Sequence, residues 1–250
     1  MRTDRGVEQG ETTIELSIVI PALNEERRLP QAIQKLTCYL DAQSIRAEVL
    51  IVENGSTDRT PAIADESALQ DARFRALHLP ARGKGGAVRS GVLASQGQIV
   101  VFCDADFSMP VEEISALYAA IANGADVAIA SREAPGAKRI GEPWRRHLMG
   151  RVFNALVRVL AVPGISDTQC GFKAFARGPA RDLFNRQILN GWAFDVEVLF
   201  LARRAGYRIR EVPVTWRYDA SSRVRPVHDT IAMLRELLVI RWNHLAGRYA

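Results

Sequence analysis

The sequence is poor in cysteine and has no long apolar run. Its three cysteines, Cys38, Cys103 and Cys170, stand far apart among 250 residues. Their spacing matches neither a metal site nor a disulfide framework, which predicts a reducing compartment. No apolar run reaches the roughly 18 residues that a membrane-spanning helix requires. We therefore expect a protein that is soluble or rests on a membrane surface.

The N-terminal residues also lead us to expect no targeting signal. Residues 1–13 are polar and contain no apolar signal-peptide region, so we expect them to form a flexible tail. The remainder, 14–250, has no internal repeat, low-complexity tract or linker. Hydrophobic residues make up 48% of the chain. This length and composition predict a single domain with a sizeable core.

The charge gives the first positive indication of function. The net charge is +5 and the sequence pI is about 9.4, which favours anionic partners such as nucleotides and phospholipid headgroups. Nucleic acid is anionic too, but the sequence lacks the basic surface interleaved with aromatic residues that binds it. We therefore expect no nucleic-acid partner.

Short apolar runs alternate with helical patterns through the first half of the chain. This alternation predicts an α/β fold with a doubly wound, mostly parallel sheet. The second half is less regular, and Pro213 there predicts an edge strand or a bulge. The predicted strands are 14–20, 49–52, 74–79, 99–102, 126–131 and 207–216, and the later predicted helices are 144–160, 191–206 and 228–245. A helix is also predicted at 87–95, after a basic glycine-rich turn, and 166–173 is expected to be a tight polar segment before Ala174.

Two aspartates follow the strand predicted at 99–102. Asp104 and Asp106 lie where open α/β sheets bind ligands, at the carboxyl end of a buried strand. With one residue between them they can share a hard cation, and a diphosphate can add further oxygen ligands. Pro110 is expected to open the next helix. In the alternative interpretation, Asp106 or Ser108 merely caps that helix.

Six motifs in a fixed order resemble those of the family 2 glycosyltransferases, in particular the group of dolichyl-phosphate glucosyltransferases and mannose synthases. The motifs are Pro21-Ala22-Leu23-Asn24-Glu25, Glu53-Asn54-Gly55-Ser56-Thr57-Asp58, Gly83-Lys84-Gly85, Asp104-Ala105-Asp106, Asp167-Thr168-Gln169-Cys170-Gly171-Phe172-Lys173 and Gly191-Trp192-Ala193-Phe194-Asp195. The resemblance covers nearly the whole chain and implies a GT-A-type fold. Its last two motifs and the surroundings of Lys84 are more similar to the glucosyl members.

The resemblance implies inverting transfer of a hexose from a nucleotide sugar, with Mg²⁺ or Mn²⁺, to a polyprenyl or dolichyl phosphate. UDP-glucose is the favoured donor. GDP-mannose as donor, a soluble acceptor, and a nucleotide-binding scaffold without catalysis stay open as alternatives. The nucleotide-sugar half would be about 14–131 and the acceptor half about 132–250.

The resemblance also implies the roles of individual residues. Asp106 is the first choice as metal ligand, and Asp104 binds either the ribose or the metal. Asp195 is the expected base, because a family base often stands there, and Asp167 is its rival. The residues expected to bind substrate are Pro21, Ala22, Asn24, Glu25, Glu53, Gly55, Ser56, Asp58, Lys84, Gly85, Asp104, Ala105, Arg132, Gln169, Arg217 and Arg223. The glycines on either side of Lys84 are expected to let a phosphate approach the backbone.

Purely structural roles compete with several of these assignments. Glu25 could favour its helix through the helix dipole, Glu53 could cap the 54–58 turn, and Lys84 could be a solvated surface lysine. Asp195 could be an ordinary first-turn acid of a helix. The chain also departs from the family at two positions, because Glu53 replaces the usual Asp and Ser108 stands where mannose synthases often have Gln.

The arginines of the second half predict a place for the lipid substrate. Arg217, Arg223 and Arg225, with Arg132 and the 138–139 pair, suit phosphate binding. Together with two amphipathic helices they predict peripheral binding to a membrane surface, on its cytoplasmic face. A membrane-bound partner protein could bring the lipid instead.

Overall fold

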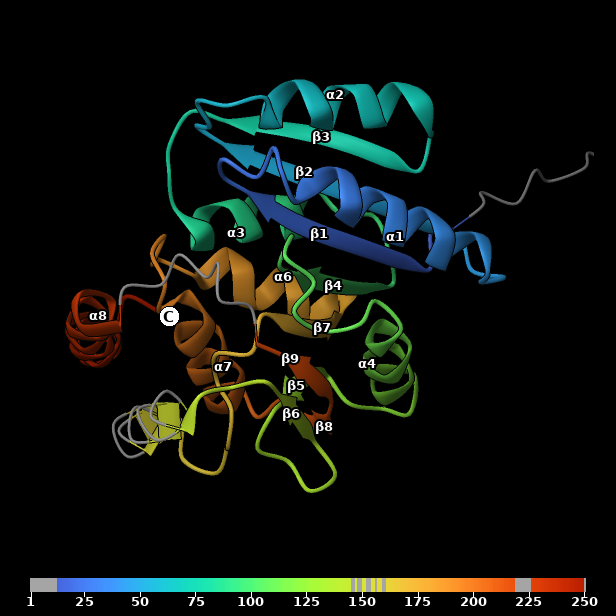
Figure 1. Ribbon diagram of the computed structural model, residues 1–250. Coiled ribbons are helices and arrows are strands. Elements are labelled where there is room, and N and C mark those ends of the chain that lie inside the picture. Colours follow the sequence, from blue (N-terminus) through green and yellow to red (C-terminus); the bar gives the residue numbers. More distant parts are fainter. Residues whose placement is uncertain are drawn as a thin grey trace, which may run out of the picture.

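The computed structural model describes residues 13–144, 147, 150–151, 154–155, 157–158, 161–218 and 226–249, with the backbone alone over 226–231. Its centre is a seven-stranded sheet in the order β3-β2-β1-β4-β7-β5-β8, and only β7 runs antiparallel to its neighbours (Figure 1). The strands are β1 (Leu16–Ala22), β2 (Ala47–Asn54), β3 (Phe74–Leu79), β4 (Ile99–Cys103), β5 (Val127–Ser131), β7 (Phe172–Ala176) and β8 (Ile209–Pro213).

Helices cover both faces of the sheet, because its central strands are buried on both sides. On one face, apolar side chains of the first, second and fourth helices pack into one core cluster; these helices are α1 (Leu29–Asp41), α2 (Thr60–Gln70) and α4 (Glu113–Ala122). A second cluster lies on the other face, under α3 (Lys84–Ala94), α6 (Arg177–Arg186), α7 (Phe194–Arg204) and α8 (Pro226–Leu245). The expected α/β fold with a doubly wound, mostly parallel sheet is therefore confirmed.

The predicted strands of the first half are all present, and 74–79 agrees to the residue with β3. The predicted strand 207–216 is two strands. β8 lies at the sheet edge and ends at Pro213, as expected, whereas β9 (Thr215–Arg217) pairs with β6 (Lys138–Ile140) in a separate two-stranded sheet. The helix predicted at 144–160 falls partly outside the described residues.

Two elements were missed, and two helices begin at other residues than expected. The polar segment before Ala174 leads into β7, which we did not predict as a strand, and α6 was missed as well. Pro110 does not open the next helix, because α4 begins at Glu113. The helix predicted from Ala87 begins at Lys84. The last difference matters most, because it places Lys84 in the first turn of α3.

α3 lies unusually close to the sheet. A Cβ added to Gly91 would collide with side chains of Val19 in β1 and Val52 in β2, so only glycine allows this approach. The close packing brings the first residue of α3, Lys84, to the edge of the sheet where β1, β2 and β4 end. None of the helices in the described parts of the chain has the length and apolarity to cross a bilayer.

Candidate active site

The site lies at the carboxyl edge of the parallel strands. β1, β2 and β4 run parallel, so the residues that follow them gather at one edge. β7 runs the other way and pairs Phe172 with Cys103, so the residues before β7 reach the same edge. The antiparallel strand therefore places Gly171 beside Asp104, across 67 positions of sequence that no local pattern connects.

Asp104 is confined between a lysine and a glycine. Lys84 Nζ lies 2.6 Å from Asp104 Oδ1. The other oxygen, Oδ2, lies against Gly171, where an added Cβ would collide with it. The Lys84 side chain is only 18% exposed, so the alternative of a solvated surface lysine is wrong. Asp104 and Lys84 thus form a partly buried ion pair.

Lys84 also faces an aromatic ring and two more carboxylates. Its Nζ lies 5.3 Å from the centre of the Trp192 ring, a cation–π distance. Burial alone would lower the pKa of Lys84, but the charges of Asp104, Asp195 and Asp106 raise it by more in total. Lys84 is therefore a stable cation at neutral pH and is suited to binding an anion.

Asp106 has a different environment from Asp104. Its Oδ1 accepts a hydrogen bond from the backbone N–H of Ser108 at 3.0 Å, within a turn where Phe107 has a φ of 44°. The alternative in which Asp106 or Ser108 caps the next helix is wrong, since α4 has no side-chain cap. Burial, together with the charge of Asp104, raises the pKa of Asp106.

Two neighbouring carboxylates of this kind fit a hard divalent cation. A cation would relieve the repulsion that raises the pKa of Asp106, and carboxylate oxygens are the ligands that Mg²⁺ and Mn²⁺ prefer. Among the described residues no group of three or more His, Cys, Asp or Glu side chains could hold a metal. The protein therefore supplies Asp104 and Asp106, and substrate or water must supply the remaining ligands.

Behind these residues lies a fully buried lysine. Lys173 Nζ lies 2.6 Å from Asp195 Oδ1, donates a hydrogen bond to the Cys170 carbonyl at 2.7 Å, and faces the Phe102 ring. Asp195 stands in the first turn of α7, as the structural alternative predicts. Burial raises the pKa of Asp195, and the charges of Lys173 and Lys84 oppose that rise. Lys173 was missed as a site residue, although it is the one charge in the apolar run 172–176.

Both carboxylate oxygens of Asp167 are paired with Arg132. The two side chains form a bidentate pair, Nε to Oδ2 at 2.7 Å and Nη2 to Oδ1 at 2.9 Å, and the Arg132 N–H also donates to Oδ2. Burial would raise the pKa of Asp167, but Arg132 lowers it to about 2. Arg132 in turn lies 5.4 Å from the Trp216 ring. With both oxygens engaged and so low a pKa, Asp167 is poorly suited to accept a proton.

The residues expected to contact a nucleotide form hydrogen bonds between the loop after β1 and the loop after β2. Asn24, with a φ of 54°, accepts from the Thr57 N–H at 2.8 Å and donates its own N–H to Ser56 Oγ at 2.9 Å. Asp58 accepts from the N–H groups of Glu26 and Thr60. These bonds join the exits of β1 and β2, so each residue has a structural role whether or not it meets a nucleotide.

Glu53 and Glu25 have structural partners as well. Glu53 accepts from the Ser56 N–H, which is the turn-capping alternative, and lies 3.4 Å from His78 Nδ1. The carboxylate of Glu25 pairs with Arg28 at 2.8 Å, within the turn that leads into α1. Pro21 and Ala22 pair with β2 at the end of β1, beside these loops.

The glycines around Lys84 accommodate protein rather than leaving a backbone surface for phosphate. A Cβ added to Gly85 would lie 2.7 Å from Phe194 Cβ and 2.8 Å from the Leu189 carbonyl. The N–H of Gly85 donates to the Asn190 carbonyl at 2.9 Å. The expectation that these glycines let a phosphate approach the backbone was therefore wrong at Gly85. Their effect is to seat the 189–194 segment, which carries Trp192, against Lys84.

The remaining predicted residues lie around this centre or outside the description. Ala105 is buried between the aspartates, and Gly55 lies in the loop after β2 with a φ of 81°. Gln169 donates to Met233 Sδ of α8 at 3.5 Å. The N–H of Arg217 donates to the Ser108 carbonyl at 2.8 Å, which places β9 beside the aspartate loop. Arg223 lies outside the described residues.

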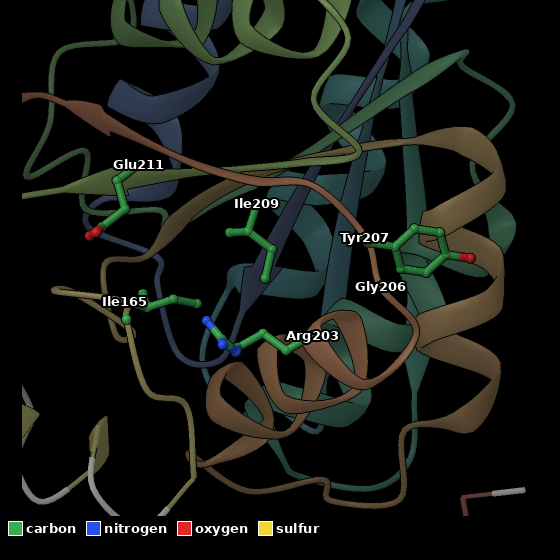
Figure 2. A pocket seen from close by; sticks show the side chains of 7 residues that line it. Ile165, Arg203, Gly206, Tyr207, Ile209 and Glu211 are labelled. Atoms are coloured by element: carbon green, nitrogen blue, oxygen red, sulfur yellow. The ribbon is translucent and has the colours of Figure 1, made fainter.

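The cavity in Figure 2 is separate from this site. Its lining includes Ile209 at the start of β8, the opposite edge of the sheet from Asp104, together with Gly164, Ile165, Arg203, Gly206, Tyr207 and Glu211. Figure 2 shows the Arg203 side chain extending toward Ile165. Glu211 is already engaged, because it accepts from the N–H groups of Ser166 and Asp167. The cavity contains none of the residues predicted to act in chemistry.

The Arg132–Asp167 pair generates a prediction about stability. Asp167→Asn would leave the buried guanidinium without its counter-charge, so we expect the free energy of unfolding at pH 7 to fall by about 3–5 kcal/mol. The folded-state pKa of Asp167 is about 2, below its unfolded value of about 3.9. Its stabilising effect is therefore present above pH ~4 and is lost as the pH falls toward 2. Urea denaturation should therefore show a smaller difference in unfolding free energy between Asp167→Asn and wild type at pH 3 than at pH 7.

Asp126→Asn is the matched control. Asp126 pairs with the exposed Arg208 at 3.2 Å, so its loss should cost less than about 1 kcal/mol. Two results would contradict the assignment of a buried ion pair. One is an equal loss of unfolding free energy in the two variants. The other is a loss in Asp167→Asn that is as large at pH 3 as at pH 7.

Comparison with known proteins agrees with this geometry. The family described as "Glycosyl transferase family 2" matches residues 17–184. The dolichyl-phosphate beta-glucosyltransferase of Drosophila melanogaster is 35% identical over 95% of this chain and 77% of its own. Glycosyltransferase AglD of Haloferax volcanii is 34% identical over 92% of this chain, which spans only 37% of AglD.

A solved structure shares the fold. The glucosyl-3-phosphoglycerate synthase of Mycobacterium tuberculosis, in complex with Mn²⁺, UDP and phosphoglyceric acid, superposes with a TM-score of 0.67. The match covers 95% of this chain and 79% of that one at 22% identity, and thus supports the GT-A-type architecture. The family match covers most of the chain, and the Drosophila relative is matched along most of its length. The chain belongs to glycosyl transferase family 2.

Proposed function

We propose that this protein transfers glucose from UDP-glucose to a polyprenyl phosphate, with inversion at the anomeric carbon. The observation that carries the proposal is the cluster of Lys84, Asp104 and Asp106 at the carboxyl edge of the sheet. The relatives named dolichyl-phosphate beta-glucosyltransferase support the donor and the acceptor. They favour glucose over mannose and a lipid phosphate over a soluble acceptor.

The reaction needs a means of stabilising the leaving diphosphate. An oxygen of the acceptor phosphate bonds to the anomeric carbon while the bond to the UDP β-phosphate oxygen breaks, and UDP leaves with the electron pair. Asp106 and Asp104 would hold Mg²⁺ or Mn²⁺, which as a Lewis acid neutralises charge on that diphosphate. Lys84 is a cation at the same edge and would donate hydrogen bonds to the diphosphate.

The acceptor needs orientation more than a strong base. A phosphate acceptor is already ionised near neutral pH, so proton removal contributes less than it would for an alcohol. Between the two candidate bases, the geometry favours Asp195, because both oxygens of Asp167 are bonded to Arg132. Lys173 holds Asp195 in place. Arg217, whose backbone is bonded to the aspartate loop, would meet the acceptor phosphate.

A donor and acceptor screen tests the proposed reaction. We expect UDP release from UDP-glucose only when a short polyprenyl phosphate is present, and much less nucleotide release from GDP-mannose or UDP-GlcNAc. EDTA and Asp106→Ala should each abolish the release, at least a hundredfold, since either removes the charge neutralisation. Added Mn²⁺ should restore the EDTA-treated wild type but not the variant.

Asp41→Ala is the control variant, because Asp41 is an exposed carboxylate of α1 that pairs only with Arg73 among the described residues. It should retain wild-type activity, and circular dichroism should show that Asp106→Ala is folded. Full activity in EDTA would contradict the metal assignment. Transfer to a soluble acceptor alone would contradict the lipid phosphate.

We also propose that α8 rests on an anionic membrane surface. Leu238, Trp242 and Leu245 are 63%, 65% and 81% exposed and follow one another at helical spacing on its outer face. Exposed arginines flank them, whereas Glu236, the one acid between 235 and 249, is bonded to the Ala193 N–H inside the protein. In Figure 1, α8 lies on the side toward which β1 and β2 point. The lipid phosphate would thus meet the site at that surface.

Sedimentation with phosphatidylglycerol vesicles tests this surface. Trp242→Glu should weaken binding at least tenfold, because it removes a large apolar side chain from the interface. Wild-type binding should also weaken as salt screens the arginines. Leu69→Glu is the control, since Leu69 is 88% exposed on α2, outside this face. If wild type stays in the supernatant at low salt, or if both variants lose binding equally, α8 is not the docking surface.

A further inference from the structure

Lys84 is paired with the oxygen of Asp104 that points away from Gly171. Oδ1 is bonded to Lys84 Nζ at 2.6 Å, and Oδ2 lies against the backbone of Gly171. A metal ion that binds Asp104 through Oδ1 must compete with the ammonium group of Lys84 for that oxygen.

Asp106 does not have such a competitor. No described cation forms a salt bridge with it, and its hydrogen-bond donors are the backbone N–H and the side chain of Ser108, which carry no charge. The charges of the centre are unequal as a result. Asp104, Asp106 and Asp195 contribute three negative charges, whereas Lys84 and Lys173 contribute two positive ones. The excess negative charge is on Asp106, which is where a metal ion would first be attracted.

The backbone of Lys84 is fixed, while its side chain is long. Gly85, the next residue, donates to the Asn190 carbonyl, and Phe194 packs against its Cα. These contacts prevent the start of α3 from moving away from the site. The four-carbon side chain beyond Cα places Nζ over the Trp192 ring and beside Asp104. Rotation of this side chain alone would transfer the ammonium group to another anion near the same edge.

We propose that Lys84 holds the metal-binding oxygen of Asp104 until a diphosphate draws the ammonium group away, so that metal and nucleotide bind cooperatively. The inference rests on the proposed function only in placing a diphosphate and a divalent cation at this edge. Without the diphosphate, a metal ion at Asp104 would face an adjacent ammonium ion, and the two cations repel each other. A bound diphosphate accepts Lys84 and frees Oδ1. Because such coupling is reciprocal, the metal must increase nucleotide affinity by the same factor.

Mn²⁺ binding, measured by electron paramagnetic resonance of the free ion, tests the proposal without any turnover. Wild type, Lys84→Met and Lys35→Met would each be titrated alone, with inorganic pyrophosphate and with UDP, against protein-free blanks. For wild type we expect at least tenfold tighter Mn²⁺ binding when either anion is present. Lys84→Met should bind Mn²⁺ at least tenfold more tightly than wild type without an anion, because a charge-assisted hydrogen bond no longer competes. Adding UDP should increase the Mn²⁺ affinity of Lys84→Met by a smaller factor than it increases that of wild type.

Lys35→Met controls for the loss of a positive charge. Lys35 is exposed on α1 and forms no ion pair with the aspartates among the described residues, so the variant should behave as wild type. Should Lys84→Met fail to fold, Lys84→Gln gives the same comparison with a neutral side chain of similar length. Lys84→Arg keeps the charge and should retain the dependence on the anion.

Two results would overturn the inference. One is Mn²⁺ affinity in the neutral variant that equals or falls below that of wild type without an anion. The other is wild-type affinity that neither pyrophosphate nor UDP increases. Failure of the proposed function is distinguishable from both. If the protein does not glucosylate polyprenyl phosphate but shows the coupling, the substrate assignment is wrong and the role of Lys84 stands.

Discussion

The ion pair between Lys84 and Asp104 links the start of α3 to the end of the central strand β4, and it forms only because the fold packs these two elements closely together. Asp104 follows the central strand β4, and Lys84 begins a helix on one face of the sheet. Gly91 allows that helix to lie close to β1 and β2. Gly85 allows the 189–194 segment to close over the helix start, and Gly171 leaves room for the carboxylate. Three glycines thus supply the close approaches on which the site depends.

Much of the fold follows from local patterns. The alternation of apolar strands and amphipathic helices predicted the α/β sheet, and Pro213 predicted the edge strand, because a proline cannot donate to a central ladder. β7 was missed for an equally physical reason. It contains a lysine whose charge is balanced by Asp195, a partner 22 residues away. A pattern that counts apolar residues cannot predict a buried charge whose counter-charge comes from another element.

The sequence predicted which residues form the site but not how they pair with one another. The resemblance to a family brought Lys84, Asp104, Asp106 and Asp195 together as candidates, and the fold places these four charges in one cluster. The sequence could not predict which groups pair with which. Asp195 was preferred to Asp167 as the base only through the resemblance, and the fold then paired Asp167 with an arginine and Asp195 with a lysine. The glycines next to Lys84 were expected to leave room for a phosphate. The residue that fills this space, Asn190, lies more than 100 positions away, and nothing in the sequence predicts that contact.

A crystal structure of the protein with UDP and Mn²⁺ is the most direct test of how this centre operates. We predict that Lys84 Nζ then lies within about 3.2 Å of a diphosphate oxygen, that it is no longer paired with Asp104 Oδ1, and that Mn²⁺ contacts both aspartates. The backbone from Gly83 to Gly86 should stay in place. A structure in which Mn²⁺ and UDP are bound while Lys84 remains on Asp104 would contradict the exchange of partners.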